Sequence, residues 1–116
     1  MKDKIVNFIK QEYGVKPEYL WKKYPTFCVF RHGDNNKWFA LVATLPRKFL
    51  SVPGDGEVDF INVKCDKENI DFLRGVPGVL PAYHMNKQNW ITVLLDGTMP
   101  IKNVKKLLQD SFDLTM

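Results

Sequence analysis

The stretch from residue 26 to residue 45 constrains the fold most, because it predicts two β-strands joined by a tight turn. Thr26–His32 (TFCVFRH) is rich in β-branched and aromatic residues, and Lys37–Leu45 (KWFALVATL) is largely apolar. Four turn-forming residues, GDNN at 33–36, stand between them. A hairpin makes its two strands antiparallel, so we expect an antiparallel sheet. The continuous apolar run Phe39–Ala43 predicts that the second strand lies centrally, with helices over one face.

The rest of the chain predicts two more strands and three helices. Residues 3–13 have helical spacing and end before Gly14, and the region from Pro46 to Gly56 is expected to be a loop. Further along, the pattern predicts these elements in turn: a strand at Val58–Cys65, a short helix at Lys67–Arg74 capped by Asp66, an extended surface loop at Val76–Met85, and a strand at Trp90–Leu95. A closing amphipathic helix is expected after Asp96-Gly97, with Pro100 at its first position.

The predicted order is therefore α-β-β-β-α-β-α. The fold class that this order favours is α+β, with two layers: an antiparallel sheet and helices on one face. A chain of 116 residues has the size of a single domain, here 1–116, and can bury a core without disulfides. The two cysteines, Cys28 and Cys65, fall in strand-like runs and are expected to be buried thiols. No apolar run is long enough to cross a membrane, so we expect a cytoplasmic protein without membrane association.

Positive charge is concentrated in the first half of the chain. The net charge is +4, and residues 1–58 hold ten Lys and Arg against six Asp and Glu, whereas the second half holds seven of each. Seven of the fifteen aromatic residues also lie between Lys16 and Lys48. Basic side chains interleaved with aromatic ones are typical of surfaces that bind single-stranded nucleic acid. Most of these aromatics are expected in the core, which leaves Tyr19, Trp21 and Tyr24 as surface candidates.

The sequence contains no recognisable catalytic, cofactor or metal-binding motif. The cysteines and histidines are widely spaced, the Gly54-Asp55-Gly56 stretch lacks the residues of a phosphate loop, and there is no nucleophile elbow. We therefore predict no cofactor, no metal and no enzymatic activity. His84 is the best candidate for acid–base chemistry, but a role in holding its proline-rich loop by hydrogen bonds to the backbone is favoured over it.

The block PAYHMNKQNWITVLLDG at 81–97 resembles the signature of the MmcQ/YjbR family of small bacterial proteins. Similar features run along almost the whole chain: Tyr24-Pro25, VFRH at 29–32, KWFAL at 37–41, INVKC at 61–65 and Ser111-Phe112-Asp113-Leu114. Two positions depart from the family pattern, in which a histidine often stands at Asn89 and a tyrosine at Phe112. An activity that needs a second histidine near His84 would be absent here.

The resemblance implies a two-layer fold similar in outline to type III secretion chaperones and frataxin-like proteins. It also implies DNA binding, through a double-wing arrangement of hairpins. On this chain the wings would be the hairpin at 33–37 and the loop at 83–89. The residues expected to contact nucleic acid are the following six: Arg31, Lys37, Arg47, Lys48, His84 and Lys87.

Three functional hypotheses follow. The first is a non-enzymatic nucleic-acid-binding protein whose contacts to phosphates give weak, salt-sensitive and largely non-specific binding. The alternative is a protein-interaction module, chaperone-like or adaptor-like, that binds a partner protein through exposed aromatic and basic residues. A third is a ligand-binding or minor enzymatic role for the loop at 84–87. DNA and another protein are thus the candidate partners, and the sequence selects no oligomeric state.

Overall fold

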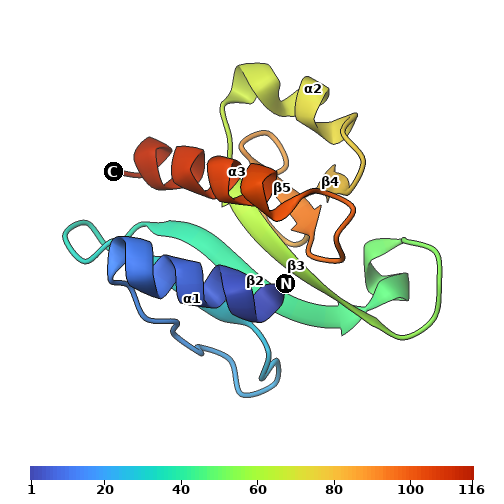
Figure 1. Ribbon diagram of the computed structural model, residues 1–116, viewed down its shortest axis with the longest axis horizontal. Helices are drawn as coiled ribbons and strands as arrows, with labels where there is room; N and C mark the ends of the chain where they lie inside the picture. Colours follow the sequence, from blue (N-terminus) through green and yellow to red (C-terminus); the bar gives the residue numbers. More distant parts are fainter.

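The computed structural model describes all 116 residues and contains one antiparallel sheet of five strands, in the order β1-β2-β3-β5-β4 (Figure 1). The strands are β1 (Cys28–Arg31), β2 (Trp38–Pro46), β3 (Glu57–Lys64), β4 (Val79–Pro81) and β5 (Trp90–Leu94). The predicted hairpin is present, since β1 pairs antiparallel with β2 along its length. The predicted fold class is confirmed: the fold is α+β, with three helices against an antiparallel sheet.

The helices lie on one face of the sheet. They are α1 (Lys2–Tyr13), α2 (Ile70–Arg74) and α3 (Ile101–Leu114), with single 3₁₀ turns η1 (Arg47–Leu50) and η2 (Lys67–Asn69). Helices α1 and α3 run side by side across the sheet, and α2 lies beyond the far edge of α3 (Figure 1). Gly14 ends α1 in the left-handed conformation, at φ 67°, as predicted, because a residue without a Cβ adopts this conformation at little cost.

Between the helices and the sheet lies the larger of two hydrophobic cores. Its centre is fully buried and combines Ile5 and Ile9 of α1 with Val104 and Leu108 of α3 and inward-facing residues of four strands. A β-bulge in the β1–β2 ladder explains why two consecutive residues of the apolar run of β2 face the same core. Phe30 pairs with Ala40 and the next residue pairs with Trp38, so Phe39 is the extra residue and points into this core beside Ala40.

The opposite face of the sheet carries no α-helix, and we call it the helix-free face. It has a smaller core, in which side chains of the segment 15–27 and of η1 cover the alternate residues of the strands. Trp21 is one of the side chains that cover this smaller core. Its ring meets Phe27 and Trp38 edge to face, at 6.2 and 5.9 Å between centroids. Trp21 is therefore half-buried rather than a free surface residue, whereas Tyr19 and Tyr24 are exposed as predicted.

The stretch Val76–Met85, predicted to be loop, contains the edge strand β4. That part of the prediction is wrong. Val79–Pro81 pairs with β5, so the true order has two strands after α2. Three residues are too few to show an alternating pattern, and a proline is tolerated at the free edge of a sheet because its missing N–H is not needed there. The structure also has Pro100 at the N-cap rather than the first helical position, and Asp66 caps η2 without a side-chain hydrogen bond.

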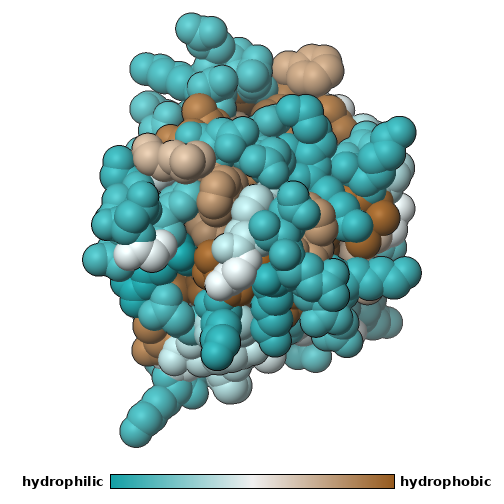
Figure 2. All heavy atoms as spheres, turned by 60° about the vertical axis from the view of Figure 1, so that its left-hand side comes forward, coloured by the Kyte–Doolittle hydropathy of each residue, from teal (hydrophilic) through white to brown (hydrophobic).

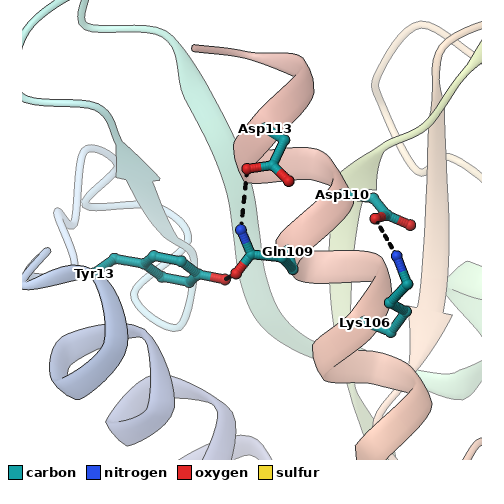
Figure 3. A network of polar contacts seen from close by, with 5 residues as sticks. All are labelled: Tyr13, Lys106, Gln109, Asp110 and Asp113. Atoms are coloured by element: carbon teal, nitrogen blue, oxygen red, sulfur yellow. Dashed lines mark hydrogen bonds and ion pairs between the residues drawn. The ribbon is translucent and has the colours of Figure 1, made fainter.

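Polar contacts fix α1 to α3 at their carboxyl-terminal ends. The hydroxyl of Tyr13 donates a hydrogen bond of 2.7 Å to Gln109, whose amide donates to Asp113 (Figure 3). The ring of Tyr13 stacks on Phe112, at 4.2 Å between centroids. Burial, and then the charges of Glu12 and Asp113, raise the pKa of Tyr13 from 10.0 to about 12. None of the helices is long and apolar enough to span a membrane.

Candidate nucleic-acid interface

Two of the turns that carry predicted basic residues project from the same end of the sheet. The β1–β2 turn comprises residues 32–37 and the β4–β5 turn residues 82–89. The ladder aligns the starts of β2 and β5, with only the last residues of β3 between them. Two strand spacings amount to about 10 Å. We call this edge the two-turn end, and it brings Lys37 into the same region as His84 and Lys87.

The β1–β2 turn is fixed to the end of α3. The ring of His32 is buried and its Nε2 lies 2.8 Å from the hydroxyl of Thr115, while the amide of Asn35 donates to the Thr115 carbonyl at 2.9 Å. Asn36 has a left-handed backbone, with φ 61°, which asparagine tolerates better than most residues. Lys37 closes the base of this turn, where its carbonyl accepts the N–H of His32 at 3.0 Å, and its side chain is exposed.

Two buried polar residues in the middle of the helix-free face hold the β4–β5 turn. Asn62 and Thr92 are fully buried neighbours on β3 and β5, and the Thr92 hydroxyl donates to the side-chain Oδ1 of Asn62 at 2.5 Å. The backbone of Tyr83 forms hydrogen bonds with both side chains. Its N–H donates to the hydroxyl of Thr92 at 2.9 Å, and its carbonyl accepts from the amide of Asn62 at 3.0 Å. The turn therefore folds back onto the sheet in a defined position.

His84 lies on the outside of this turn. Its backbone is left-handed, with φ 54°, and its ring stacks on Tyr83 at 3.9 Å with 10° between the planes. Tyr83 in turn packs against Phe60 of the smaller core. The expectation that His84 bonds to the backbone of its loop is wrong, because Asn62 and Thr92 hold that backbone instead. His84 is exposed and has no hydrogen-bonding partner that would orient it for acid–base catalysis.

Arg47 and Lys48 lie at the opposite end of the sheet from the two-turn end. They follow β2, whose nine residues span about 30 Å at about 3.3 Å each. They line a shallow hollow to which Asp55 and Glu57 also contribute, so two acidic residues lie close to them. The expectation that all six basic residues form one surface is therefore not met: these two belong to another region.

Arg31 lies on edge strand β1, and an acidic partner holds it. Its guanidinium makes two hydrogen bonds to Glu18, of 2.7 and 2.6 Å. This pairing lowers the pKa of Glu18 and raises the pKa of Arg31. By contrast, Lys37 and Lys87 take part in no ion pair, so each is a free cation at the two-turn end.

Aromatic side chains accompany these cations on the helix-free face. Trp38 packs against the smaller core, and Trp90 faces the same side because it is two residues before Thr92 on β5. Both indole rings are half-buried, with part of each accessible to solvent. Figure 2 brings forward the side that carries the β1–β2 turn. Hydrophilic residues cover most of it, and hydrophobic residues form small recessed patches.

The polar residues that position the β4–β5 turn were not identified from the sequence. Asn62 and Thr92 stand inside runs that read as buried strands, INVKC and WITVLL, where a polar residue is out of pattern. A buried polar side chain needs a hydrogen-bonding partner, so a polar residue inside an apolar strand indicates a contact with another segment. This was the signal that the sequence offered. No group of three or more histidine, cysteine or acidic side chains is arranged to hold a metal ion.

The chain matches the family model described as YjbR over residues 11–114. It is 39% identical to the uncharacterised protein YyaQ of Bacillus subtilis over 98% of this chain and 97% of that protein. The uncharacterised protein YbdF of Escherichia coli is 31% identical over 85% of this chain and 72% of its own length.

Solved structures show the same fold. A crystal structure of a Pseudomonas syringae protein, 42% identical, superposes with a TM-score of 0.97 over 100% of this chain and 99% of the other. A Deinococcus radiodurans protein, 26% identical, gives a TM-score of 0.63 over 86% of this chain and 67% of its own.

Proposed function

The chain belongs to the YjbR family, and we propose that it is a non-enzymatic nucleic-acid-binding protein that contacts phosphates through its two-turn end. One observation carries the proposal. The β1–β2 and β4–β5 turns project from the same end of the sheet, each is fixed by buried polar contacts, and each presents a lysine without an acidic partner. Turns with a fixed backbone suit the binding of phosphates, since only the lysine side chains then lose conformational freedom on binding.

The chemistry of this surface predicts weak binding without sequence preference. Lys37 and Lys87 offer point charges, and His84 offers a ring nitrogen beside them. Contacts of this kind position a nucleic acid but do not read its bases. The half-exposed rings of Trp38 and Trp90 add surfaces on which unpaired bases can stack, so single strands are the favoured substrate. Arg47 and Lys48 are outside the proposed surface.

The experiment compares short fluorescent single strands and duplexes by fluorescence anisotropy at about 50 mM and about 200 mM salt. Lys37→Gln combined with Lys87→Gln is expected to weaken binding and to reduce the log–log salt slope for the duplex by about 1.8, because each neutralised phosphate contributes about 0.9. Lys4→Gln combined with Lys48→Gln removes the same charge, also from lysines without an ion pair but away from the two-turn end, and serves as the matched control.

Any of three results would contradict the proposal. One is the absence of any binding by the unmodified protein at the lower salt concentration. Another is equal weakening by the two double variants, because net charge alone would then account for the affinity. The third is retention of the salt slope in the Lys37 and Lys87 variant, which would place the contacts elsewhere on the molecule.

A further inference from the structure

A shallow apolar groove runs between α2 and α3, on the helix-bearing side of the molecule. Two adjoining hollows, of about 450 and 770 Å³, share the same floor, which consists of Phe72, Leu73 and Leu107. Phe72 is 76% exposed, more than any other large hydrophobic residue of the chain. Because most of its surface is open to solvent, Phe72 contributes little to the core, and it adjoins Leu73 and Leu107 in one exposed apolar patch.

The two ends of the groove carry opposite charges. The hollow toward the start of α3 is lined by three lysines: Lys102, Lys105 and Lys106. The hollow toward the end of α3 is lined by three aspartates, Asp66, Asp110 and Asp113, and by one lysine, Lys64, so the charge of its lining is negative on balance.

Some of these charges are already engaged within the protein. Lys106 and Asp110 pair with each other at 2.7 Å near the middle of the groove (Figure 3), and Lys105 lies over the ring of Phe8, 4.9 Å from its centroid. Lys102 at one end and Asp66 at the other take part in no ion pair. The groove thus presents a free cation, an apolar floor and a free anion, in that order.

We propose that this groove binds an amphipathic peptide segment of another protein, with apolar residues in its centre, an acidic residue at one end and a basic residue at the other. The segment would lie along α3. Lys102 and Asp113 are eleven positions apart on the helix, which corresponds to about 16 Å and therefore to a peptide helix of about three turns. This site is separate from the two-turn end and does not depend on nucleic-acid binding.

The charges at the two ends of the groove disfavour a nucleic acid and a fatty acid as its ligand. A nucleic acid would meet three aspartates at one end, and like charges repel it. A fatty acid carries a single carboxylate and would leave the acidic end without a partner. A peptide helix with an apolar stripe satisfies the floor and both ends at once, and this is a recurring mode of recognition for grooves between helices.

The test begins with a displayed library of peptides of about 15 residues, long enough for the three turns. The library is selected on the unmodified protein and counter-selected on Phe72→Ala. We expect the retained peptides to have an apolar centre with acidic residues toward one end and basic residues toward the other.

A selected peptide is then labelled and its Kd measured by anisotropy. Phe72→Ala is expected to weaken binding about tenfold or more, as for a buried aromatic anchor. Lys102→Glu is expected to weaken it about three- to fivefold, as for an exposed ion pair. The matched control is Phe49→Ala, which removes another exposed phenylalanine, 52% accessible, on η1.

The proposal is overturned if no peptide survives counter-selection, or if the retained peptides share no charge order. It is also overturned if Phe49→Ala weakens binding as much as Phe72→Ala. Light scattering identifies a second copy as the occupant if the protein forms a concentration-dependent dimer that Phe72→Ala abolishes. Displacement of the selected peptide by laurate at micromolar concentration would assign the groove to fatty acids instead.

Discussion

The hydroxyl of Ser111 on α3 donates a hydrogen bond of 2.6 Å to the carbonyl of Phe39 on β2. The same oxygen accepts the N–H of Lys64 at 2.8 Å, so a single buried side chain joins α3 to two strands of the sheet. Phe39 is the bulged residue of β2, and a bulge interrupts the normal ladder bonds. Ser111 thereby satisfies backbone groups at the two-turn end and holds the last turns of α3 against it.

Ser111→Ala is expected to destabilise the protein by about 1–3 kcal/mol, because it leaves a buried carbonyl and a buried N–H without a partner. Denaturation with urea measures the change. Ser51→Ala makes the same chemical change at an exposed serine without a side-chain hydrogen bond and should be close to neutral. Equal stability of the two variants would show that water replaces the Ser111 hydroxyl.

Thr92→Val is expected to loosen the β4–β5 turn at a similar cost, about 1–3 kcal/mol. The change keeps the shape of the side chain but removes the oxygen that bonds both Asn62 and the Tyr83 N–H. Hydrogen exchange at the amide of Tyr83 should accelerate more than exchange at residues of the β1–β2 turn. Uniform acceleration along the chain would indicate global destabilisation and contradict a local anchoring role.

Alkaline pH should destabilise the protein in a window set by Tyr13. The pKa of Tyr13 is 10.0 in the unfolded chain and about 12 in the folded protein, because folding favours the neutral hydroxyl. The contribution of this group to the free energy of unfolding is therefore complete below pH 10 and is lost as the pH rises through about 12. Absorbance at the tyrosinate wavelength should show a latest step that belongs to Tyr13, while burial also raises the pKa of Tyr19 above its usual value. Tyr13→Phe removes that late step and flattens the stability profile in the window; an unchanged titration curve would assign the step to another residue.

Glu18→Gln should strengthen nucleic-acid binding, because it removes the carboxylate that now engages Arg31. The log–log salt slope is expected to steepen by about 0.9, for one added phosphate contact. Glu57→Gln changes the net charge equally at the other end of the sheet and is the control. The pKa of Glu18 is lowered by Arg31, so the pairing is lost only as the pH falls through that lowered pKa. Equal affinities for the two variants would exclude Arg31 from the interface.

Neither cysteine should react readily with alkylating reagents in the folded protein. Cys28 and Cys65 are free and buried, and burial raises the pKa of both thiols, which lowers the fraction of reactive thiolate near neutral pH. Mass spectrometry after brief treatment with iodoacetamide should find an unmodified chain, and two additions after denaturation. Rapid single labelling without denaturant would reveal local opening of the strand that carries the modified residue.

The hairpin and the closing helix could be predicted from the sequence because their signals are local. GDNN between two apolar runs specifies a turn, and the apolar spacing from Ile101 onward specifies an amphipathic helix. Strand β4 could not be predicted in this way. Its three residues become a strand only because β5 offers an unpaired edge, and the residues of β5 that they pair with lie ten to fourteen positions further along the chain.

The sequence alone determined the α+β class, the buried cysteines and the exposed Tyr19 and Tyr24, since hydrophobic pattern and turn chemistry act between near neighbours in the chain. Only the tertiary structure decided which charges share a surface. It placed Lys37 and Lys87 at one end of the sheet and Arg47 at the other, and it paired Arg31 with Glu18. Strand register and segment packing fix these distances, and neither is encoded in the spacing of charged residues along the chain.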